Sequence, residues 1–298
     1  SWNSGNTDHS KSEHVSIPLI PEQMSKGKYI LVNGSFVPTD ECQISLIESE
    51  AIHFSEKFRA IRTSFPFFNE TLELIKRKLS LYNQSFAEFT DNDGAVLKRQ
   101  LERTLTKNKH FLGATLILTI RFTGQKIYFT IQSEKIDPVG YELNEKGLYV
   151  EIFDQIRKST STLSNLSIGS EIYWEIAANY LKESSVDEFL LVNTSAQIIE
   201  TPESNIYLIK GKSVRGASSK QGAYQDITKL IMLDIFSRLN LEYAEDKGIT
   251  NGDFRDTEEI MVVNSIKGIR WIVGFEEKRY FNNTIRKITE LFNQRVIS

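Results

Sequence analysis

The chain is poor in the residues from which disulfide frameworks and metal centres are built. Its 298 residues include one cysteine, Cys42, and four histidines, His9, His14, His53 and His110. A single thiol excludes an intrachain disulfide, and the scattered histidines match no metal-ligand spacing. The sequence therefore predicts no metal site, and it suits a reducing compartment such as the cytoplasm.

Long apolar runs and an excess of positive charge are also missing. No apolar run approaches the roughly 20 residues that a membrane span needs, and residues 1–23 lack the apolar core of a signal peptide. Lysine and arginine number 36 against 39 aspartates and glutamates, a net charge of −3. Neither a membrane nor a nucleic acid is therefore expected as a partner. Met24 is a possible natural start, so residues 1–27 are interpreted as an N-terminal extension.

The first half of the chain has the pattern of a small α/β domain, placed at residues 28–135. Residues 28–37 contain two apolar runs about Asn33-Gly34, which is the strongest short signal for a β-hairpin. Apolar spacing predicts a helix at 69–83, with Asn69 as its N-cap. The other elements expected here are a helix at about 93–108 and strands at 114–122 and 126–132.

The second half predicts a larger α/β domain at residues 158–298. Residues 136–157 are interpreted as the interdomain connection, polar at first, followed by the first strand. A helix with Ser170 as its N-cap is expected at 171–183, and another at 283–294. The cleft between the two domains is the expected place for a ligand.

Three motifs in the second half follow one another in a fixed order. Ser164-Asn165-Leu166 enters a helix, a strand follows at 187–193, and Glu200 precedes the strand Ser204-Asn205-Ile206-Tyr207. This series resembles the fold-type IV pyridoxal-phosphate enzymes, the class of branched-chain and D-amino-acid aminotransferases and 4-amino-4-deoxychorismate lyase, and is closest to the lyase-like branch. The resemblance covers residues 28–294. It implies a two-domain α/β (α+β) fold with mixed sheets and flanking helices, and a homodimer.

The resemblance also assigns site positions. Ser167 occupies the position of the lysine that forms the Schiff base, and Glu200 that of the carboxylate that pairs with the protonated pyridine nitrogen. The positions that contact the phosphate correspond to Ile227, Thr228, Asn264 and Ser265. Two interpretations of Glu200 stay open. A pyridine-like ligand still binds it, or its carboxylate forms hydrogen bonds that stabilise the Ser204-Asn205 turn.

Three of the family's positions are changed together. Ser167 replaces the lysine, Leu74 the phosphate-clamping arginine, and Asp226 a loop glycine. A hydroxyl cannot form an imine, and leucine cannot make the bidentate bonds of arginine to a phosphate. Asp226 repels a phosphate and is interpreted as a helix cap that has replaced a ligand. Arg77, one turn beyond Leu74, is expected on a solvated face. The active site is thus expected to be degenerate, with no covalently bound pyridoxal phosphate.

The candidates for a substrate pocket are His53, Arg62 and Arg121. His53 lies near a tyrosine position of the family, although a partly buried structural histidine is the alternative interpretation. Arg121 lies in the strand that carries a substrate-binding arginine in lyase-like members, where the resemblance places Ile117 at the position of that arginine. It serves that role or caps the strand.

Three hypotheses about function follow. The chain is a pseudoenzyme that binds a small molecule or a partner, or an enzyme that runs different chemistry with Glu200, Thr228, Arg62 or His53. Otherwise it is an active pyridoxal-phosphate aminotransferase or aminodeoxychorismate lyase whose lysine comes from elsewhere. Lys158 is the nearest such lysine in sequence, and it matches a family position outside the pocket.

Overall fold

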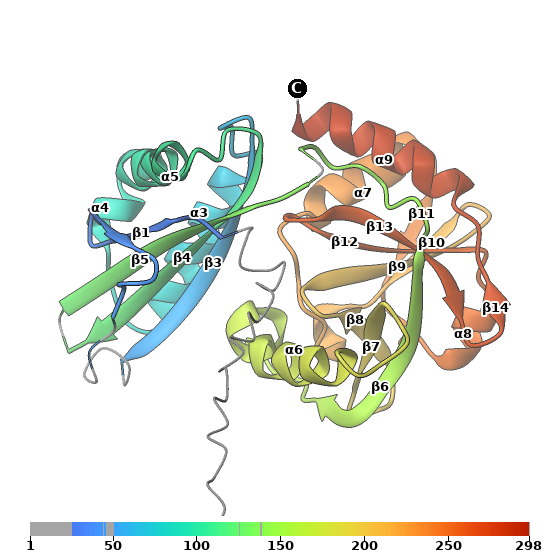
Figure 1. Ribbon diagram of the computed structural model, residues 1–298. Helices are drawn as coiled ribbons and strands as arrows, with labels where there is room; N and C mark the ends of the chain where they lie inside the picture. The colour runs from blue at the N-terminus through green and yellow to red at the C-terminus, as the bar shows by residue number, and fades with distance from the viewer. Residues whose placement is uncertain (1–25, 44, 46–50, 125, 138, 298) are drawn as a thin grey trace, which may run out of the picture.

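The computed structural model describes residues 26–297 except 44, 46–50, 125 and 138. Two β-sheets lie side by side, each with its own helices (Figure 1). This is the predicted α/β fold with mixed sheets and flanking helices. Residues 1–25, most of the proposed N-terminal extension, lie outside the described part.

The first sheet has five strands in the order β2-β1-β5-β4-β3, all antiparallel. Its strands are β1 (Tyr29–Val32), β2 (Ser35–Pro38), β3 (Ile52–Ile61), β4 (Gly113–Thr123) and β5 (Lys126–Lys135). The predicted hairpin is present, and Asn33 and Gly34 both have positive φ, 47° and 87°. Positive φ at both central residues gives a turn whose twist matches that of the strands it joins.

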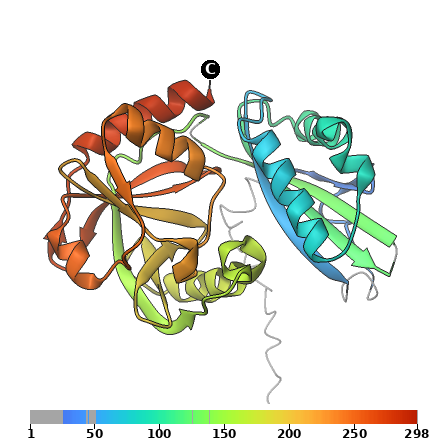
Figure 2. The same ribbon diagram turned by 180° about the vertical axis from the view of Figure 1, so that it is seen from behind.

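The described part of the first domain also contains the helices α3 (Phe68–Leu81), α4 (Ala87–Thr90) and α5 (Ala95–Asn108). In Figure 2 they lie against one face of the sheet, where Ile75, Leu101 and Leu105 are fully buried. The predicted N-cap Asn69 is wrong, because α3 begins one residue earlier, with Phe67 at the cap. Burying the rings of Phe67 and Phe68 stabilises this start by about 1.5–3 kcal/mol each, more than the ~1 kcal/mol of a side-chain cap.

The second sheet has nine strands, and eight follow the order β11-β10-β9-β12-β13-β6-β7-β8 while β14 pairs with β13. Because β8 also pairs with β9, six strands close into a ring. The strands are β6 (Leu148–Lys158), β7 (Glu188–Asn193), β8 (Ile198–Thr201), β9 (Ser204–Lys210), β10 (Ser213–Gly216), β11 (Glu242–Ala244), β12 (Glu259–Asn264), β13 (Gly268–Phe275) and β14 (Lys278–Arg279). Closure brings the turns after β8 and β12 and the end of β6 to one region of the domain.

The second domain carries α6 (Ser167–Leu181), α7 (Lys229–Arg238), α8 (Asn251–Asp256) and α9 (Asn283–Val296). Helix α6 begins four residues before the predicted start, so Ser170 is not its N-cap. Ser170 lies inside the first turn, where its buried hydroxyl donates to the carbonyls of Ser164 and Leu166. The short 3₁₀ turn Leu163–Asn165 leads almost directly into the helix, which is why α6 starts early.

The segment between Lys135 and Leu148 joins the two sheets and makes contacts with both (Figure 1). The guanidinium of Arg59, on β3, donates to the carbonyl of Val139 at 2.9 Å. The Tyr141 ring packs against Phe67 of the first domain and Phe292 of α9, with centroids 6.3 and 5.3 Å away. These contacts hold β3 over the edge of the second domain, where the cleft lies.

Candidate functional site

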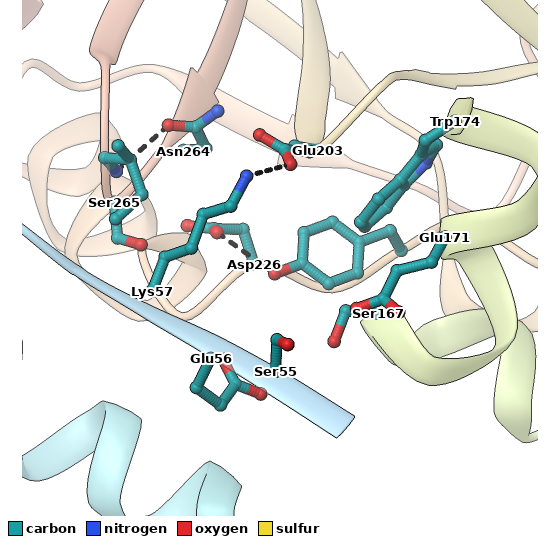
Figure 3. Close-up of a pocket in the computed structure, with 12 residues that line it drawn as sticks. Ser55, Glu56, Lys57, Ser167, Glu171, Trp174, Glu203, Asp226, Asn264 and Ser265 are labelled. Atoms are coloured by element: carbon teal, nitrogen blue, oxygen red, sulfur yellow. Dashed lines mark hydrogen bonds and ion pairs between the residues drawn. The ribbon is translucent and has the colours of Figure 1, made fainter. Parts of the chain in front are cut away.

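The cleft between β3 and the second domain contains a cavity with a volume of about 80 Å³. Figure 3 shows side chains from both domains pointing into it. Its lining comprises Ser55, Glu56 and Lys57 of β3, Ser167, Glu171 and Trp174 of α6, Asn264 at the end of β12, and Glu203, Tyr224, Asp226, Ser265 and Ile266 from the segments after β8, β10 and β12. This is the place that the sequence predicts for a ligand.

Glu200 lies beneath this cavity as the acceptor of a buried ion pair. It is fully buried, and the Lys158 ammonium donates to both of its carboxylate oxygens at 2.8 Å. The indole N–H of Trp174 and the backbone N–H of Tyr224 donate to the same carboxylate at 2.8 and 2.6 Å. Four hydrogen bonds therefore saturate Glu200, which does not line the cavity.

Lys158 is the last residue of β6, and its side chain is 1% exposed. Burial raises the pKa of Glu200 and lowers that of Lys158, while their pairing opposes both shifts. A pair like this costs free energy to desolvate, and losing one partner leaves the other charge buried alone. Lys158 was predicted to lie outside the pocket, and it does not line the cavity. It is nevertheless bonded to the one carboxylate that the motif singled out.

A second buried network surrounds Asp226, at the start of α7. Both the backbone N–H and the hydroxyl of Thr228 donate to Asp226 Oδ1, at 2.9 and 2.6 Å. The Tyr224 hydroxyl donates to Oδ2 at 3.3 Å, and the Asp226 N–H donates to the side chain of Asn205. Burial raises the pKa of Asp226 to about 6, although the bonds from Thr228 oppose that shift. Asp226 thus accepts the two hydrogen bonds, from the amide and the hydroxyl of Thr228, that the resemblance implies for a phosphate.

The side chain of Asn264 likewise uses its hydrogen-bonding groups on neighbouring protein residues. Its side-chain oxygen accepts from the backbone N–H groups of Ile266 and Lys267 at 3.0 and 2.7 Å. Its amide nitrogen donates to the hydroxyl of Ser204 at 2.9 Å. The Ser265 carbonyl accepts from Tyr141, but no bond to the Ser265 hydroxyl occurs among the described residues. Asn264 therefore shapes the turn, and Ser265 offers its hydroxyl to the cavity.

Ser167 meets a lysine from the other domain. The ammonium of Lys78, on α3, contacts the Ser167 hydroxyl, the carboxylate of Glu56 and, at 3.2 Å, the carbonyl of Ser55. Lys78 is fully buried, and its ammonium donates to Ser55 and Ser167 and forms an ion pair with Glu56. Because an ammonium cannot accept a hydrogen bond, Ser167 must be the acceptor here, and its own O–H proton remains available to the cavity.

Lys57 is the one lysine among the described residues that lines the cavity. Its ammonium pairs with Glu203, and both side chains are more than one-third exposed (39% and 37%). Glu203 has φ of 63°, which is uncommon for a residue other than glycine. Because it follows Pro202 in the two-residue turn between β8 and β9, this conformation aims its carboxylate across the cleft at Lys57 (Figure 3).

The three candidates for a substrate pocket do not line this cavity, and their role stays a prediction. His53 and Arg121 are register partners on β3 and β4, two residues beyond Ser55, or roughly 7 Å along the strand. His53 is exposed, which contradicts the interpretation as a partly buried structural histidine. Arg62 is exposed in the turn that follows β3.

The remaining predicted positions lie in or beside the cavity. Ser167, Asn264 and Ser265 line it, whereas Glu200 and Thr228 are buried behind it. Ile227 instead lines a neighbouring surface pocket together with Leu74 and Arg77, and Arg77 is exposed, as predicted for a solvated face.

Sequence reasoning missed Lys57, Lys78, Glu171, Trp174 and Tyr224. Only Lys78 gave a usable signal, because it falls between Ile75 and Leu79 on the apolar stripe of a helix, where a lysine is unexpected. Among the described residues no group of His, Cys, Asp and Glu is arranged to hold a metal ion. No described helix is long and apolar enough to cross a membrane.

Comparison with known proteins agrees with this architecture. The branched-chain aminotransferase of Thermoproteus uzoniensis, solved with norvaline, has a TM-score of 0.76 at 16% identity, over 90% of this chain and 94% of that one. A putative 4-amino-4-deoxychorismate lyase from Legionella pneumophila gives 0.73 at 17%, over 86% and 97%. A Brucella abortus aminotransferase bound to pyridoxal phosphate gives 0.75 at 13%, over 91% and 99%.

At this level of identity the solved structures establish the fold alone. A search of curated proteins by sequence finds no match. The family profile described as amino-transferase class IV matches residues 83–274, which is well over half of the chain and includes the whole of α6, Glu200 and Asp226. The chain therefore belongs to the class IV aminotransferase family.

Proposed function

We propose that this chain is a class IV aminotransferase homologue that does not act as a conventional transaminase and that binds a small molecule in its interdomain cleft. The observation that carries the proposal is the bond of Lys158 to both oxygens of Glu200. By resemblance, Glu200 is the acceptor for the protonated ring nitrogen of pyridoxal phosphate. The ammonium of Lys158 supplies the same charge and the same kind of donor, so the acceptor is already used.

The phosphate end of the cofactor meets the same obstacle. Asp226 already accepts from the amide and the hydroxyl of Thr228, and Asn264 is bonded within its own turn. A phosphate dianion brought to this helix start would face a buried carboxylate. The arginine that could offset this repulsion is replaced by Leu74, which lies on a different pocket.

The covalent attachment point is also missing. Ser167 cannot form an imine, and the lysine that contacts it, Lys78, is held by three acceptors and does not line the cavity. The residues present do not fit pyridoxal phosphate at its ring nitrogen, its phosphate or its aldehyde. The chemistry that this cofactor supplies, stabilisation of a carbanion, is therefore not expected here.

A relocated lysine is the second candidate, and one observation favours it. Lys57 lines the cavity and is partly exposed, so its amine is accessible to a carbonyl compound once its proton has passed to a base such as Glu203. An enzyme without a lysine nucleophile is less well supported. Of its four proposed groups, Glu200 and Thr228 are buried, whereas His53 and Arg62 lie outside the cavity.

Titration with pyridoxal phosphate tests the proposal. The purified chain is scanned for the absorbance of an imine, reduced with borohydride and mapped by peptide mass spectrometry, with the Brucella abortus aminotransferase as positive control. We expect an imine band and an adduct in the control alone. A stoichiometric adduct on Lys57, Lys78 or Lys158 would overturn the proposal and establish an enzyme with a relocated nucleophile.

The same resemblance leads us to propose a homodimer, since the family builds its pockets at a dimer interface. Exposed apolar side chains on α6 and α7 are consistent with such contacts, with Ile172 and Leu230 exposed by 57% and 79%.

A further inference from the structure

The cavity has more negative than positive groups around it, and pairing does not remove the excess. Four carboxylates line it, Glu56, Glu171, Glu203 and Asp226, against the ammonium of Lys57 and the adjacent Lys78. Glu203 is paired with Lys57, and Glu56 with Lys78. Asp226 is satisfied by Thr228 and Tyr224. Glu171 is the carboxylate left over.

Glu171 makes no hydrogen bond or ion pair with any residue that the structure describes. It lies one turn after Ser167 on α6, is half-buried, and points into the cavity (Figure 3). Burial raises the pKa of Glu171, and Glu56 and Glu175 add to that rise, whereas Lys78 and Lys57 oppose it. A partly desolvated carboxylate without a partner gains free energy from a cation that brings N–H donors.

Aromatic rings stand beside this carboxylate. Trp174, one turn further along α6, lines the cavity and packs edge-to-face against Tyr224, with ring centroids 4.9 Å apart. The indole N–H donates to Glu200, so the part of Trp174 that lines the cavity is its apolar aromatic ring, which carries negative potential on its faces. Aromatic faces attract cations by about 0.5–2 kcal/mol. The Glu171 carboxylate and the Trp174 indole together therefore favour a ligand that carries a positive charge.

We propose that the cavity binds a small organic cation, a primary alkylammonium, with Glu171 as the anchor of the ammonium and Trp174 flanking its alkyl chain. The Ser167 hydroxyl is free to donate to any acceptor that the ligand carries. The open volume of about 80 Å³ suits a chain of a few carbons. This inference rests on the proposed function, since it requires a cleft that does not hold pyridoxal phosphate.

The test uses the full chain and three probes of equal size, propylammonium, propan-1-ol and propionate. Binding is followed by the NMR shift of the Trp174 indole N–H, which a Trp174→Phe spectrum assigns. We expect saturable binding of propylammonium alone, weakened at least tenfold in Glu171→Gln. Glu175→Gln is the matched control, because Glu175 is exposed one turn along the same helix, and it should bind as the wild type does.

Equal binding of propan-1-ol, or unchanged binding of propylammonium to folded Glu171→Gln, would overturn the inference. Circular dichroism of each variant establishes that it is folded, and Glu171→Asp provides a second variant that keeps the charge and should retain more binding than Glu171→Gln. The failures are distinguishable. If no cation binds and pyridoxal phosphate leaves no adduct, this inference alone fails, whereas a stoichiometric adduct refutes the proposed function.

Discussion

Removing the ammonium of Lys158 should reveal how much the fold depends on the pair beneath the cleft. In Lys158→Met the Glu200 carboxylate stays fully buried, 0% exposed, and keeps only the donors of Trp174 and Tyr224. Two charges 2.8 Å apart attract by about 6 kcal/mol at an effective dielectric constant of 20. Breaking a buried pair from one side costs about 3–5 kcal/mol, and we expect a loss of that size.

The loss should depend on pH and on the second partner. Without the cation, Glu200 keeps a raised pKa because of its burial, so it takes up a proton as the pH falls and the penalty shrinks. Lys158→Met should therefore be less destabilising at pH 5 than at pH 8. Glu200→Gln in the same chain removes the charge and keeps an acceptor oxygen. The double variant should recover about 2 kcal/mol of the single loss.

Urea unfolding followed by both circular dichroism and tryptophan fluorescence measures these differences, because coincident transitions are needed for a single free energy in a two-domain chain. Lys210→Met is the control. Its ammonium lies 3.4 Å from Asp256, but both side chains are mostly exposed, so we expect about 0–1 kcal/mol. A loss below about 1 kcal/mol for Lys158→Met would refute the view that this pair is a structural necessity.

Three further predictions concern the same region. Because burial raises the pKa of Asp226 from 3.8 to about 6, the folded state binds its proton more tightly, so this group lowers stability by about 2 kcal/mol as the pH rises from 4 to 7. Asp226→Asn should lose that slope in urea unfolding at a series of pH values, and an unchanged slope would contradict the assignment. Trp174→Phe removes a 2.8 Å bond to a buried carboxylate and should cost about 1.5–3 kcal/mol in the same assay, with a smaller loss counting against the network. Light scattering should give twice the mass of the chain, and a monomer would contradict the proposed homodimer.

Local patterns were enough to predict most of the fold. The Asn33-Gly34 hairpin, the strands β4 and β5 and the apolar faces of α5 and α9 follow from spacings within a few residues. Helix starts were less predictable, as Asn69 and Ser170 illustrate, since burial of neighbouring rings and a preceding 3₁₀ turn decide them. The pairing of β8 with β9 across the ring depends on contacts that no local pattern encodes.

The site was predictable only where a motif marks it. Glu200 and Asp226 stand out because they lie at fixed positions of the family's series. The lysines bonded to Glu200 and to Ser167 are less visible, because Lys158 lies 42 residues from Glu200, and Lys78 lies 89 residues from Ser167. His53 and Arg121 lie on β3 and β4 at positions that do not line the cavity, and Arg62 lies in the turn after β3. Which side chains reach the cavity depends on contacts between distant parts of the chain, and no local sequence pattern encodes these contacts.

If the proposed function is right, the changes at the cofactor positions are coupled by electrostatics rather than independent. A chain that lost the cofactor alone would keep an acceptor at Glu200 and donors at Thr228 with nothing to satisfy them, and each buried polar group left unpaired costs about 1–3 kcal/mol. On this proposal Lys158 takes the place of the positively charged ring nitrogen beside Glu200, and Asp226 takes the place of the phosphate beside Thr228. The positive charge of Lys158 lies beside the Glu200 acceptor, and the negative charge of Asp226 lies beside the Thr228 donors.

Restoring the lysine by itself should therefore fail to restore the cofactor. In Ser167→Lys the ring-nitrogen acceptor and the helix start remain occupied, so we expect no imine absorbance with pyridoxal phosphate and no borohydride-stable adduct. Adding Lys158→Met and Asp226→Gly frees Glu200 and the Thr228 donors, and only this triple variant should yield an adduct at position 167. If Ser167→Lys alone bound the cofactor stoichiometrically, neither side chain would be acting as a substitute for it, and the loss of the lysine would be the whole difference between this chain and an active enzyme.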